Sequence, residues 1–209
     1  DSIRAYRRRK LISMNVYDFD KTIFKIDSTA GLVKYLFVHE PRTLLSIPRT
    51  VVFGIGYGLH IVKKLTFKTN LYHMFTFVKD MDAVVDAYVE DSMRYVQKWY
   101  LEQQKADDVI ISASPEFLIK RFAKKLGVQY VMASKVDLHS GAYDGLNCHG
   151  KEKVTRFYAM FPEGHVDGFW SDSLTDTPLA RIADHAYLVK GAKMTKWPEE
   201  VLEKEGKSR

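Results

Sequence analysis

Near its beginning the chain contains the stretch N-V-Y-D-F-D-K-T (residues 15–22), in which a short segment rich in strand-forming residues leads directly into two aspartates. Side chains alternate along an extended backbone, so Asp18 and Asp20 can point the same way while Phe19 turns into the core. Two carboxylates this close together repel each other unless a cation lies nearby or one of them keeps its proton. The stretch therefore predicts a strand that delivers two carboxylates to a functional site. The alternative is a strand end with two solvated acids.

Three further polar clusters follow in chain order. S-A-S-P comes directly after the apolar run at residues 109–111, G-K-E-K-V opens a helix at residue 150, and S-D-S-L-T-D-T-P follows a strand predicted at 166–170. Further strands are predicted at 129–132 and 186–189, with helices between them. This alternation predicts an α/β fold of the Rossmann-like, three-layer kind, with a parallel sheet between helices. Polar clusters at the carboxyl ends of such strands converge even when they are far apart in the sequence.

The region between the first and second predicted strands has a different pattern. Apolar residues recur there at helical spacing from residue 42 to about 101. We therefore predict a helical cap at residues 41–104, inserted into a core formed by residues 14–40 and 105–209. The basic residues before Met14 predict that residues 1–13 are an extension that docks loosely on the domain.

Local signals predict where individual elements begin and end. Asp27 or Ser28 can cap a helix in the first part of the chain. Ser114 is the expected N-cap of a later helix, which Gly127 terminates. Residues 136–146 alternate and contain S-G and D-G turns, which predicts a small β excursion.

Residues 44–62 form an apolar, glycine-rich segment that contains V-V-F-G-I-G-Y-G-L-H-I-V. Pro48 and Arg49 interrupt it, and its clean apolar part is shorter than the roughly 20 residues that a membrane-spanning helix needs. Basic residues flank the segment, and no acid occurs between Arg42 and Lys68. We favour a helical hairpin that packs over the active site, and a segment that touches lipid headgroups is the alternative.

Charge and cysteine content narrow the classes of partner. The chain of 209 residues has a net charge of +6, which permits phosphorylated metabolites, nucleic acid or a lipid surface as partners. Nucleic acid is not expected, because the sequence shows no clear reading motif and no basic face interleaved with aromatic residues. A single cysteine, Cys148, excludes an internal disulfide, and no Cys/His set has zinc spacing. We predict a cytoplasmic protein, with membrane association through the cap as the open alternative.

The carboxylates of the first and fourth clusters predict a metal site. Asp18, Asp20 and Asp172 supply hard oxygen ligands, which suit Mg²⁺ because this ion prefers carboxylates, waters and phosphate oxygens. Its charge would also offset the repulsion between the neighbouring acids. Mg²⁺ is therefore the expected cofactor.

The second and third clusters predict a phosphate site opposite the metal. Ser112 and the backbone amides of Ala113 and Ser114 are expected at a helix N-terminus, where free N–H groups favour an anion. A lysine from the helix that begins near residue 150 would add a point charge to the same phosphoryl group.

The four clusters D-F-D-K-T, S-A-S-P, G-K-E-K-V and S-D-S-L-T-D-T-P, in this order and with a helical insertion after the first, resemble the four motifs of the haloacid dehalogenase superfamily. The branch that they resemble, subfamily IB, holds phosphoserine phosphatase and phosphatidylglycerophosphate phosphatase. The resemblance covers the chain from Val16 to about Val189.

This resemblance implies a role for each matching residue. Asp18 is implied to be the nucleophile that forms an aspartyl-phosphate, and Asp20 the general acid and then the general base. Asp172 is implied to bind Mg²⁺. The implied phosphate-binding residues are Thr22, Ser112, Ala113 and Lys153.

Two supporting positions and several departures qualify the match. The pattern G-x-x-K-V favours Lys153, whereas Lys151 directly follows the glycine, so the choice between the two lysines stays open. Asp176 would hold the metal through a water or orient Lys153. The departures from the motifs are Lys21 in place of a glycine, Ser171 and Ser173 where glycines are frequent, and Thr175 at a position that is often Asn.

The resemblance implies a Mg²⁺-dependent phosphomonoester phosphatase. Its expected substrate is a small phosphorylated metabolite similar to phosphoserine. The acid-free cap favours a second substrate class, a lipid phosphate similar to phosphatidylglycerophosphate. A non-catalytic module that binds cations and anions is the third alternative.

Overall fold

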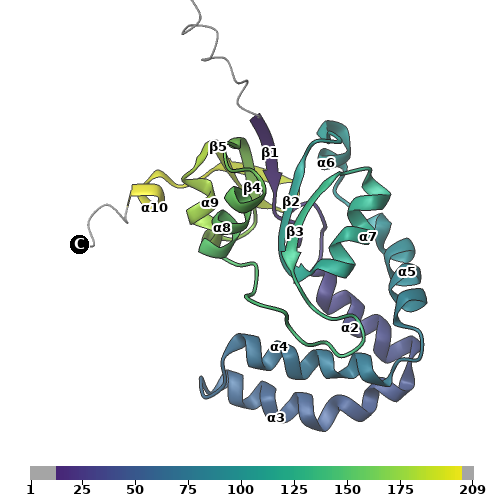
Figure 1. The fold of residues 1–209 in the computed structure, drawn as a ribbon. Helices are drawn as coiled ribbons and strands as arrows, with labels where there is room; N and C mark the ends of the chain where they lie inside the picture. The colour runs from purple at the N-terminus through teal and green to yellow at the C-terminus, as the bar shows by residue number, and fades with distance from the viewer. Residues whose placement is uncertain (1–12, 204–209) are drawn as a thin grey trace, which may run out of the picture.

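The computed structural model describes residues 13–203, which are built around one six-stranded sheet (Figure 1). The strand order is β3-β2-β1-β4-β5-β6, and all neighbouring pairs are parallel except β5 and β6. The predicted α/β fold with a largely parallel sheet is confirmed. The strands are β1 (Ser13–Tyr17), β2 (Val109–Pro115), β3 (Tyr130–Ser134), β4 (His165–Ser171), β5 (Ala183–Lys190) and β6 (Lys193–Lys196).

The chain between β1 and β2 is helical, as its periodicity predicted. It forms α2 (Ser28–His39), α3 (Ile47–Gly58), α4 (Lys64–Tyr72), α5 (Met81–Ser92) and α6 (Lys98–Gln103), with 3-10 turns η1 (Pro41–Ser46), η2 (His73–Phe77) and η3 (Met93–Tyr95). The boundaries predicted for the cap (41–104) and for the core stay predictions. None of the helices within residues 13–203 combines the length and the apolar character that a membrane span requires.

The remaining helices follow β2, and all but α10 cover the sheet. They are α7 (Glu116–Leu126), α8 (Lys151–Met160), α9 (Thr177–Ala180) and α10 (Glu199–Glu203), with one 3-10 turn, η4 (Leu174–Asp176). In Figure 1, α6 and α7 lie on one side of the sheet and α8 and α9 on the other.

Alternation along β2 shows how the two faces are filled. Ile110 packs into a cluster with residues of α2, α5 and α7, whereas Val109 and Ile111 pack into a second cluster with Phe157 of α8 and Leu179 of α9. All five side chains are fully buried. A strand that is apolar on both faces is typical of a parallel sheet between helices.

Two of the predicted helix boundaries are confirmed and one is wrong. Asp27 caps α2 by accepting a hydrogen bond from the backbone N–H of Ala30, and Gly127 ends α7 in the left-handed conformation with φ 70°. Ser114 is not the N-cap of α7, because β2 continues through Pro115 and Pro115 itself holds that position. The hydroxyl of Ser114 does not cap the helix but donates a hydrogen bond to the carboxylate of Asp20.

The β excursion predicted at residues 136–146 is reduced to an isolated bridge between Val136 and Tyr143. Gly141 in this loop has φ 71°, and a Cβ there would lie 2.5 Å from the backbone oxygen of Tyr72. The loop therefore packs against the end of α4, where only glycine fits. Figure 1 shows this loop running beside α4.

The edge strand β6 was not predicted. It is four residues long, pairs antiparallel with β5, and exposes Lys193 and Lys196. Most of the predicted extension at residues 1–13 lies outside the described residues, and Ser13 begins β1.

Candidate functional site

A pocket of about 350 Å³ lies beyond the carboxyl ends of β1, β2 and β4. Parallel strands direct their carboxyl ends to one edge, so residues from distant parts of the chain meet there. The residues from the strand ends, η4 and α8 that line it include Asp18, Asp20, Ala113, Ser114, Lys153, Asp172 and Asp176, and those from α3 and α4 are Tyr57, Lys64, Phe67, Lys68, Leu71 and Tyr72.

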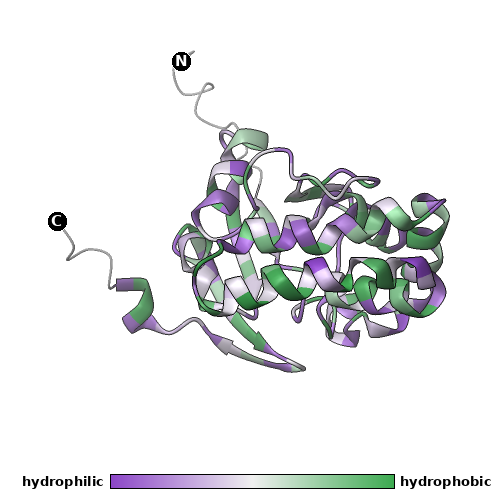
Figure 2. Cartoon of the chain, turned by 90° about the horizontal axis from the view of Figure 1, so that it is seen from below, coloured by the Kyte–Doolittle hydropathy of each residue, from purple (hydrophilic) through white to green (hydrophobic). Residues whose placement is uncertain are grey.

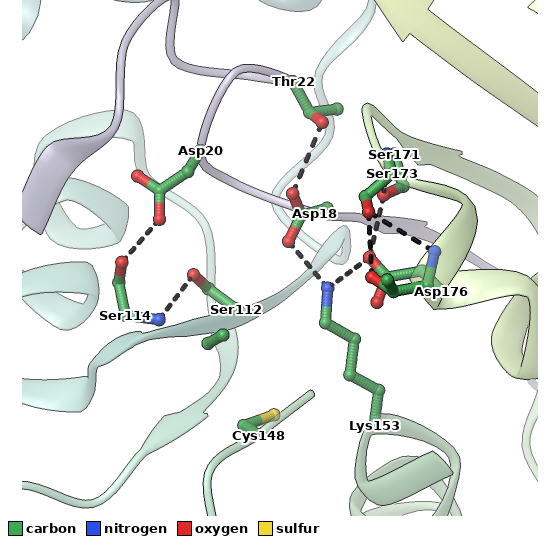
Figure 3. Close-up of polar contacts among 12 residues, drawn as sticks. Asp18, Asp20, Thr22, Ser112, Ser114, Cys148, Lys153, Ser171, Ser173 and Asp176 are labelled. Carbon is green, nitrogen blue, oxygen red and sulfur yellow. Dashed lines mark hydrogen bonds and ion pairs between the residues drawn. The ribbon is translucent and has the colours of Figure 1, made fainter. Parts of the chain in front are cut away.

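Lys153 forms the centre of a buried charge cluster at this pocket (Figure 3). Its Nζ lies 2.7 Å from Oδ1 of Asp18 and 2.7 Å from Oδ2 of Asp176, and its side chain is 2% exposed. Ser171 donates a further hydrogen bond of 2.8 Å to the same oxygen of Asp176. Lys151, two residues earlier on α8 (Lys151–Met160), is exposed. The structure thus places Lys153, and not Lys151, in the site.

The cluster strongly perturbs its ionisable groups. Burial, together with the nearby Asp176 and Asp20, raises the pKa of Asp18 to about 7, although Lys153 opposes the shift. Burial alone would lower the pKa of Lys153, but the two carboxylates more than offset this effect and raise it. Lys153 is therefore a permanent cation, whereas Asp18 changes its charge near neutral pH.

Asp20 lies in a separate hydrogen-bond network. Its Oδ1 accepts the backbone N–H of Ser28 at 2.6 Å, and its Oδ2 accepts the hydroxyl of Ser114 at 2.5 Å. The hydroxyl of Thr29 lies 2.8 Å from that of Ser114. Burial raises the pKa of Asp20, Asp27 adds to this shift, and the bonds from Ser114 and Ser28 oppose it. Figure 3 shows the carboxylates of Asp18 and Asp20 facing different partners.

The predicted phosphate-binding residues differ in whether they line the pocket. Ala113 lines the pocket, but Ser112 and Thr22 are fully buried and do not line it. The hydroxyl of Thr22 donates to Oδ2 of Asp18 at 3.4 Å. The prediction of a free amide at Ser114 is wrong, because this N–H donates to the hydroxyl of Ser112 at 3.1 Å.

Two carboxylates of the pocket fit a Mg²⁺ site. Among residues 13–203, no three His, Cys, Asp or Glu side chains lie close enough together to hold a metal ion. However, Mg²⁺ is usually bound by one or two carboxylates together with waters and substrate phosphate. Asp18 and Asp172 fit this arrangement, since both line the pocket and burial raises the pKa of each. Both oxygens of Asp20 already accept hydrogen bonds, so its place among the metal ligands stays a prediction.

The departures from the motifs have identifiable places. Lys21 adopts φ 57°, a left-handed conformation that glycine takes without strain, and its charge opposes the upward pKa shift of Asp172. Ser171 holds Asp176 as described. Ser173 and Thr175 bond to each other at 2.8 Å between hydroxyl oxygens.

The cap contributes a basic and aromatic wall to the pocket. Lys64 and Lys68 are four residues apart on α4, so both face the same side of that helix. Nζ of Lys68 donates to the carbonyl oxygen of Ala113 at 3.1 Å, which ties the cap to β2. Burial lowers the pKa of Lys68, and the neighbouring Lys64 lowers it further.

Sequence reasoning did not assign these two lysines to the site, nor the hydroxyls of Ser114 and Thr29. The i, i+4 spacing was the available signal for Lys64 and Lys68. The second serine of S-A-S-P was the signal for Ser114.

Comparisons with known proteins match most of the chain. Residues 16–181 match the model of the haloacid dehalogenase-like hydrolases. Protein CicA of Caulobacter vibrioides is 33% identical over 186 residues, which cover 80% of this chain and 82% of that protein. A probable phosphatase of Mycobacterium tuberculosis is 30% identical over 107 residues, which cover 44% of this chain and 37% of that protein.

A solved structure shows the same fold. A probable phosphoserine phosphatase from Vibrio cholerae superposes with a TM-score of 0.62 and 9% identity, covering 83% of this chain and 55% of that one. At this identity the likeness is one of fold.

Proposed function

The chain belongs to the haloacid dehalogenase-like hydrolases, and from this premise we propose that it is a Mg²⁺-dependent phosphatase that cleaves phosphate monoesters through an aspartyl-phosphate at Asp18. The observation that carries the proposal is the buried contact of Lys153 with both Asp18 and Asp176 in a pocket that Asp20 also lines. A purely structural cation site would not need Asp20 and its hydroxyl network beside it.

In the first step, a carboxylate oxygen of Asp18 attacks phosphorus, and the bond from phosphorus to the ester oxygen breaks. Lys153 favours the ionised nucleophile and offsets negative charge on the phosphoryl oxygens. Asp20 gives its proton to the leaving alkoxide oxygen. The raised pKa of Asp20 suits this role, because burial keeps the carboxyl protonated at higher pH than usual.

In the second step, water attacks phosphorus, Asp20 takes a proton from it, and the bond to Asp18 breaks to release inorganic phosphate. The hydroxyl of Ser114, which is itself paired with that of Thr29, holds Asp20 in place through both proton transfers. When bound by Asp18 and Asp172, Mg²⁺ would supply positive charge that neutralises the phosphoryl group.

The leading substrate class is a small phosphorylated metabolite similar to phosphoserine. Asp27 lines the pocket and uses only Oδ1 as a helix cap, which leaves an oxygen to meet an ammonium group. A lipid phosphate is the second candidate. Lys64 and Lys68 suit a second anionic group on the substrate, and Tyr57 and Phe67 suit an apolar part.

Phosphate release from a panel of substrates tests the proposal. We expect release from p-nitrophenyl phosphate, and from either phosphoserine or phosphatidylglycerophosphate, that stops when Mg²⁺ is removed with a chelator. Preference for one of the last two compounds decides between the two substrate classes. A folded protein that releases no phosphate from any of the three would favour the non-catalytic binding module.

The raised pKa of Asp18 predicts that the effect of Mg²⁺ on stability depends on pH. Folding raises this pKa from 3.8 to about 7, so the protonated carboxyl stabilises the folded protein. This contribution to the free energy of unfolding is complete below pH 3.8. That contribution is lost as the pH rises through the upper value. Mg²⁺ binds the ionised form, so we expect its apparent affinity to be about tenfold or more higher at about pH 8 than at about pH 5.5.

Thermal unfolding with and without Mg²⁺ at the two pH values measures this difference. The rise in melting temperature caused by Mg²⁺ should be larger at the higher pH. The Asp18→Asn variant is the control and should show a weaker pH dependence, because Asp172 is then the only proposed carboxylate ligand that still titrates. Equal rises at both pH values in the unmodified protein would contradict the assignment of Asp18 as a ligand.

A further inference from the structure

The first turn of α2 holds both oxygens of Asp20, the residue proposed to transfer the protons. The backbone N–H of Ser28 donates to Oδ1 at 2.6 Å, and the hydroxyl of Ser114 donates to Oδ2 at 2.5 Å (Figure 3). The hydroxyl of Thr29 lies 2.8 Å from that of Ser114. Ser28 and Thr29 open α2, so the position of Asp20 depends on the position of this turn.

The number of available protons gives these contacts a direction. While Asp20 is ionised, the single proton of the Ser114 hydroxyl is used in its bond to the carboxylate. Thr29 must therefore be the donor in its contact with Ser114. Thr29 thus fixes the hydroxyl of Ser114, which in turn fixes the carboxylate. Ser28, Thr29 and Ser114 are all buried, and hydrogen bonds are stronger where water is scarce.

Tyr88 of α5 fastens the same turn. Its hydroxyl donates a hydrogen bond of 2.8 Å to the backbone oxygen of Ser28, which lies 60 positions earlier in the chain. Tyr88 is buried and does not line the pocket, so it meets no substrate. Burial raises the pKa of Tyr88, and its hydroxyl therefore keeps the proton that it donates. This bond joins a helix away from the chemistry to the turn that holds Asp20.

Gly31 makes room for this bond. It lies inside α2, three residues after Ser28, and a Cβ there would lie 2.2 Å from the hydroxyl oxygen of Tyr88. Even alanine could not occupy the position without moving the tyrosine. Glycine within a helix is less favourable than alanine, because it loses more backbone freedom on folding. The close approach of Tyr88 to α2 explains why glycine is present here.

The ring of Tyr88 is held by the apolar cluster between α2, α5 and α7. It lies edge-on to Phe122 of α7, with ring centroids 6.2 Å apart and planes at 86°, and its centroid lies 5.5 Å from that of Tyr35 of α2. In Figure 2, which views the molecule from below, the helices between β1 and β2 carry both hydrophobic residues (green) and hydrophilic ones (purple), as expected of helices that bury one side. The hydroxyl of Tyr88 therefore has a defined position.

We propose that Tyr88 is a positioning residue for Asp20: through its bond to Ser28 it fixes the first turn of α2, and this turn aims the carboxyl of Asp20 at the oxygen of the leaving group. Gly31 supplies the space that the bond requires. The inference rests on the proposed function, in which Asp20 gives its proton to that oxygen. A shift of this turn should weaken the proton transfer and leave the attack by Asp18 intact.

The basicity of the leaving group separates the proton transfer from other steps. An alkoxide needs a proton as it leaves phosphorus, whereas p-nitrophenolate is weakly basic and leaves without one. We expect Tyr88→Phe to lower kcat/KM about tenfold or more for ethyl phosphate, less for phenyl phosphate, and no more than about twofold for p-nitrophenyl phosphate. Because kcat/KM covers the steps up to phosphoryl transfer, slow hydrolysis of the aspartyl-phosphate does not mask the effect.

Gly31→Ala tests the same contact with the tyrosine hydroxyl still present. The added methyl group should push Tyr88 away from Ser28 and cause the same selective loss of kcat/KM. Without the hydroxyl, the methyl group has less to displace. The Gly31→Ala/Tyr88→Phe variant should therefore resemble Tyr88→Phe, and its loss should be smaller than the product of the two separate losses.

The matched control is Tyr100→Phe. Tyr100 is fully buried in the same apolar cluster, but its hydroxyl donates to Asp108, which precedes β2 and so lies at the opposite end of this strand from the pocket. Each of the two Tyr→Phe variants should lose no more than about 2–4 °C in melting temperature, the shift expected for one hydrogen bond in a chain of this size. Only Tyr88→Phe should change the relative kcat/KM values of the three esters.

The pattern across the three esters distinguishes the positioning role of Tyr88 from the phosphatase activity itself. An equal loss on all esters in Tyr88→Phe, or no loss on any of them, would overturn the positioning role and leave the proposed function standing. The same selective loss in Tyr100→Phe would also overturn it. If the unmodified, folded protein released no phosphate from any of the esters, the proposed function would fail and the role of Tyr88 with it.

Discussion

Replacing Asp18 by asparagine is expected to abolish phosphate release, with kcat falling by roughly 10⁴-fold or more. Asparagine keeps the shape of the side chain and its contacts with Lys153 and Thr22, but its amide cannot attack phosphorus. In the unmodified enzyme, acid quenching during turnover should trap phosphate on the protein. The variant should carry none.

Stability provides an independent measurement on the same variant. Burial and the neighbouring Asp176 and Asp20 raise the pKa of Asp18, so a neutral residue removes the cost of burying an ionised carboxylate there. We expect the melting temperature of Asp18→Asn to equal or exceed that of the unmodified protein near pH 8 in the absence of Mg²⁺. Loss of activity with a retained fold separates chemistry from folding.

The matched control is Asp167→Asn, because Asp167 lies on β4 but is exposed. The Asp167→Asn variant should change neither kcat nor the melting temperature. Turnover by Asp18→Asn at more than about a hundredth of the normal rate would show that another group attacks phosphorus.

The second large effect is expected from Lys153→Met, which should reduce both stability and activity. Methionine fills similar space but leaves the buried carboxylates of Asp18 and Asp176 without their shared cation. Breaking a buried ion pair from one side typically costs about 3–5 kcal/mol in the free energy of unfolding. Loss of the charge on the phosphoryl group should also lower kcat by roughly 10²-fold or more.

The pH dependence gives this loss of stability a distinct signature. Without Lys153, the pKa of Asp18 should rise further, because Lys153 is the largest influence that lowers it. The destabilisation should therefore be greatest at high pH and smallest when the carboxyl is protonated. Denaturant unfolding at about pH 5 and about pH 8 measures the difference.

Lys151→Met is the matched control, two residues away on the same helix. Its side chain is exposed, so we expect a change within about 0.5 kcal/mol and unchanged turnover. If Lys151→Met and Lys153→Met behaved alike, the buried charge cluster would have no energetic role.

The convergence of Asp18, Lys153 and Asp176 could be predicted from the sequence because it follows from topology. Each residue follows a strand or opens a helix beside the same edge of a parallel sheet, and that arrangement can be inferred from periodicity. The choice between Lys151 and Lys153 depended on which side of α8 faces the sheet. The structure answers it through burial, which spacing alone could not measure.

The partners of Asp20 could not be predicted in the same way. Serine before proline is a common helix start, so local propensity favoured Ser114 as the N-cap of α7. Its hydroxyl instead bonds to Asp20, which lies 94 positions earlier in the chain. A tertiary contact of this range overrides a local preference of about 1 kcal/mol.

The segment at residues 44–62 shows a limit of hydrophobic patterns. An apolar run predicts a surface that avoids water, but it does not distinguish a protein partner from a lipid one. Here one face of α3 packs on Phe67 and the other is exposed, and contact of that exposed face with lipid stays a prediction.

The short edge strand β6 bears on how the protein behaves at high concentration. An open sheet edge offers unpaired backbone groups to any extended segment of another molecule and can seed fibrous aggregates. At β6 an incoming strand would have to align with only four residues and lie against the ammonium groups of Lys193 and Lys196. Growth of the sheet from one molecule to the next is therefore discouraged at this edge, which favours a dispersed protein in concentrated solution.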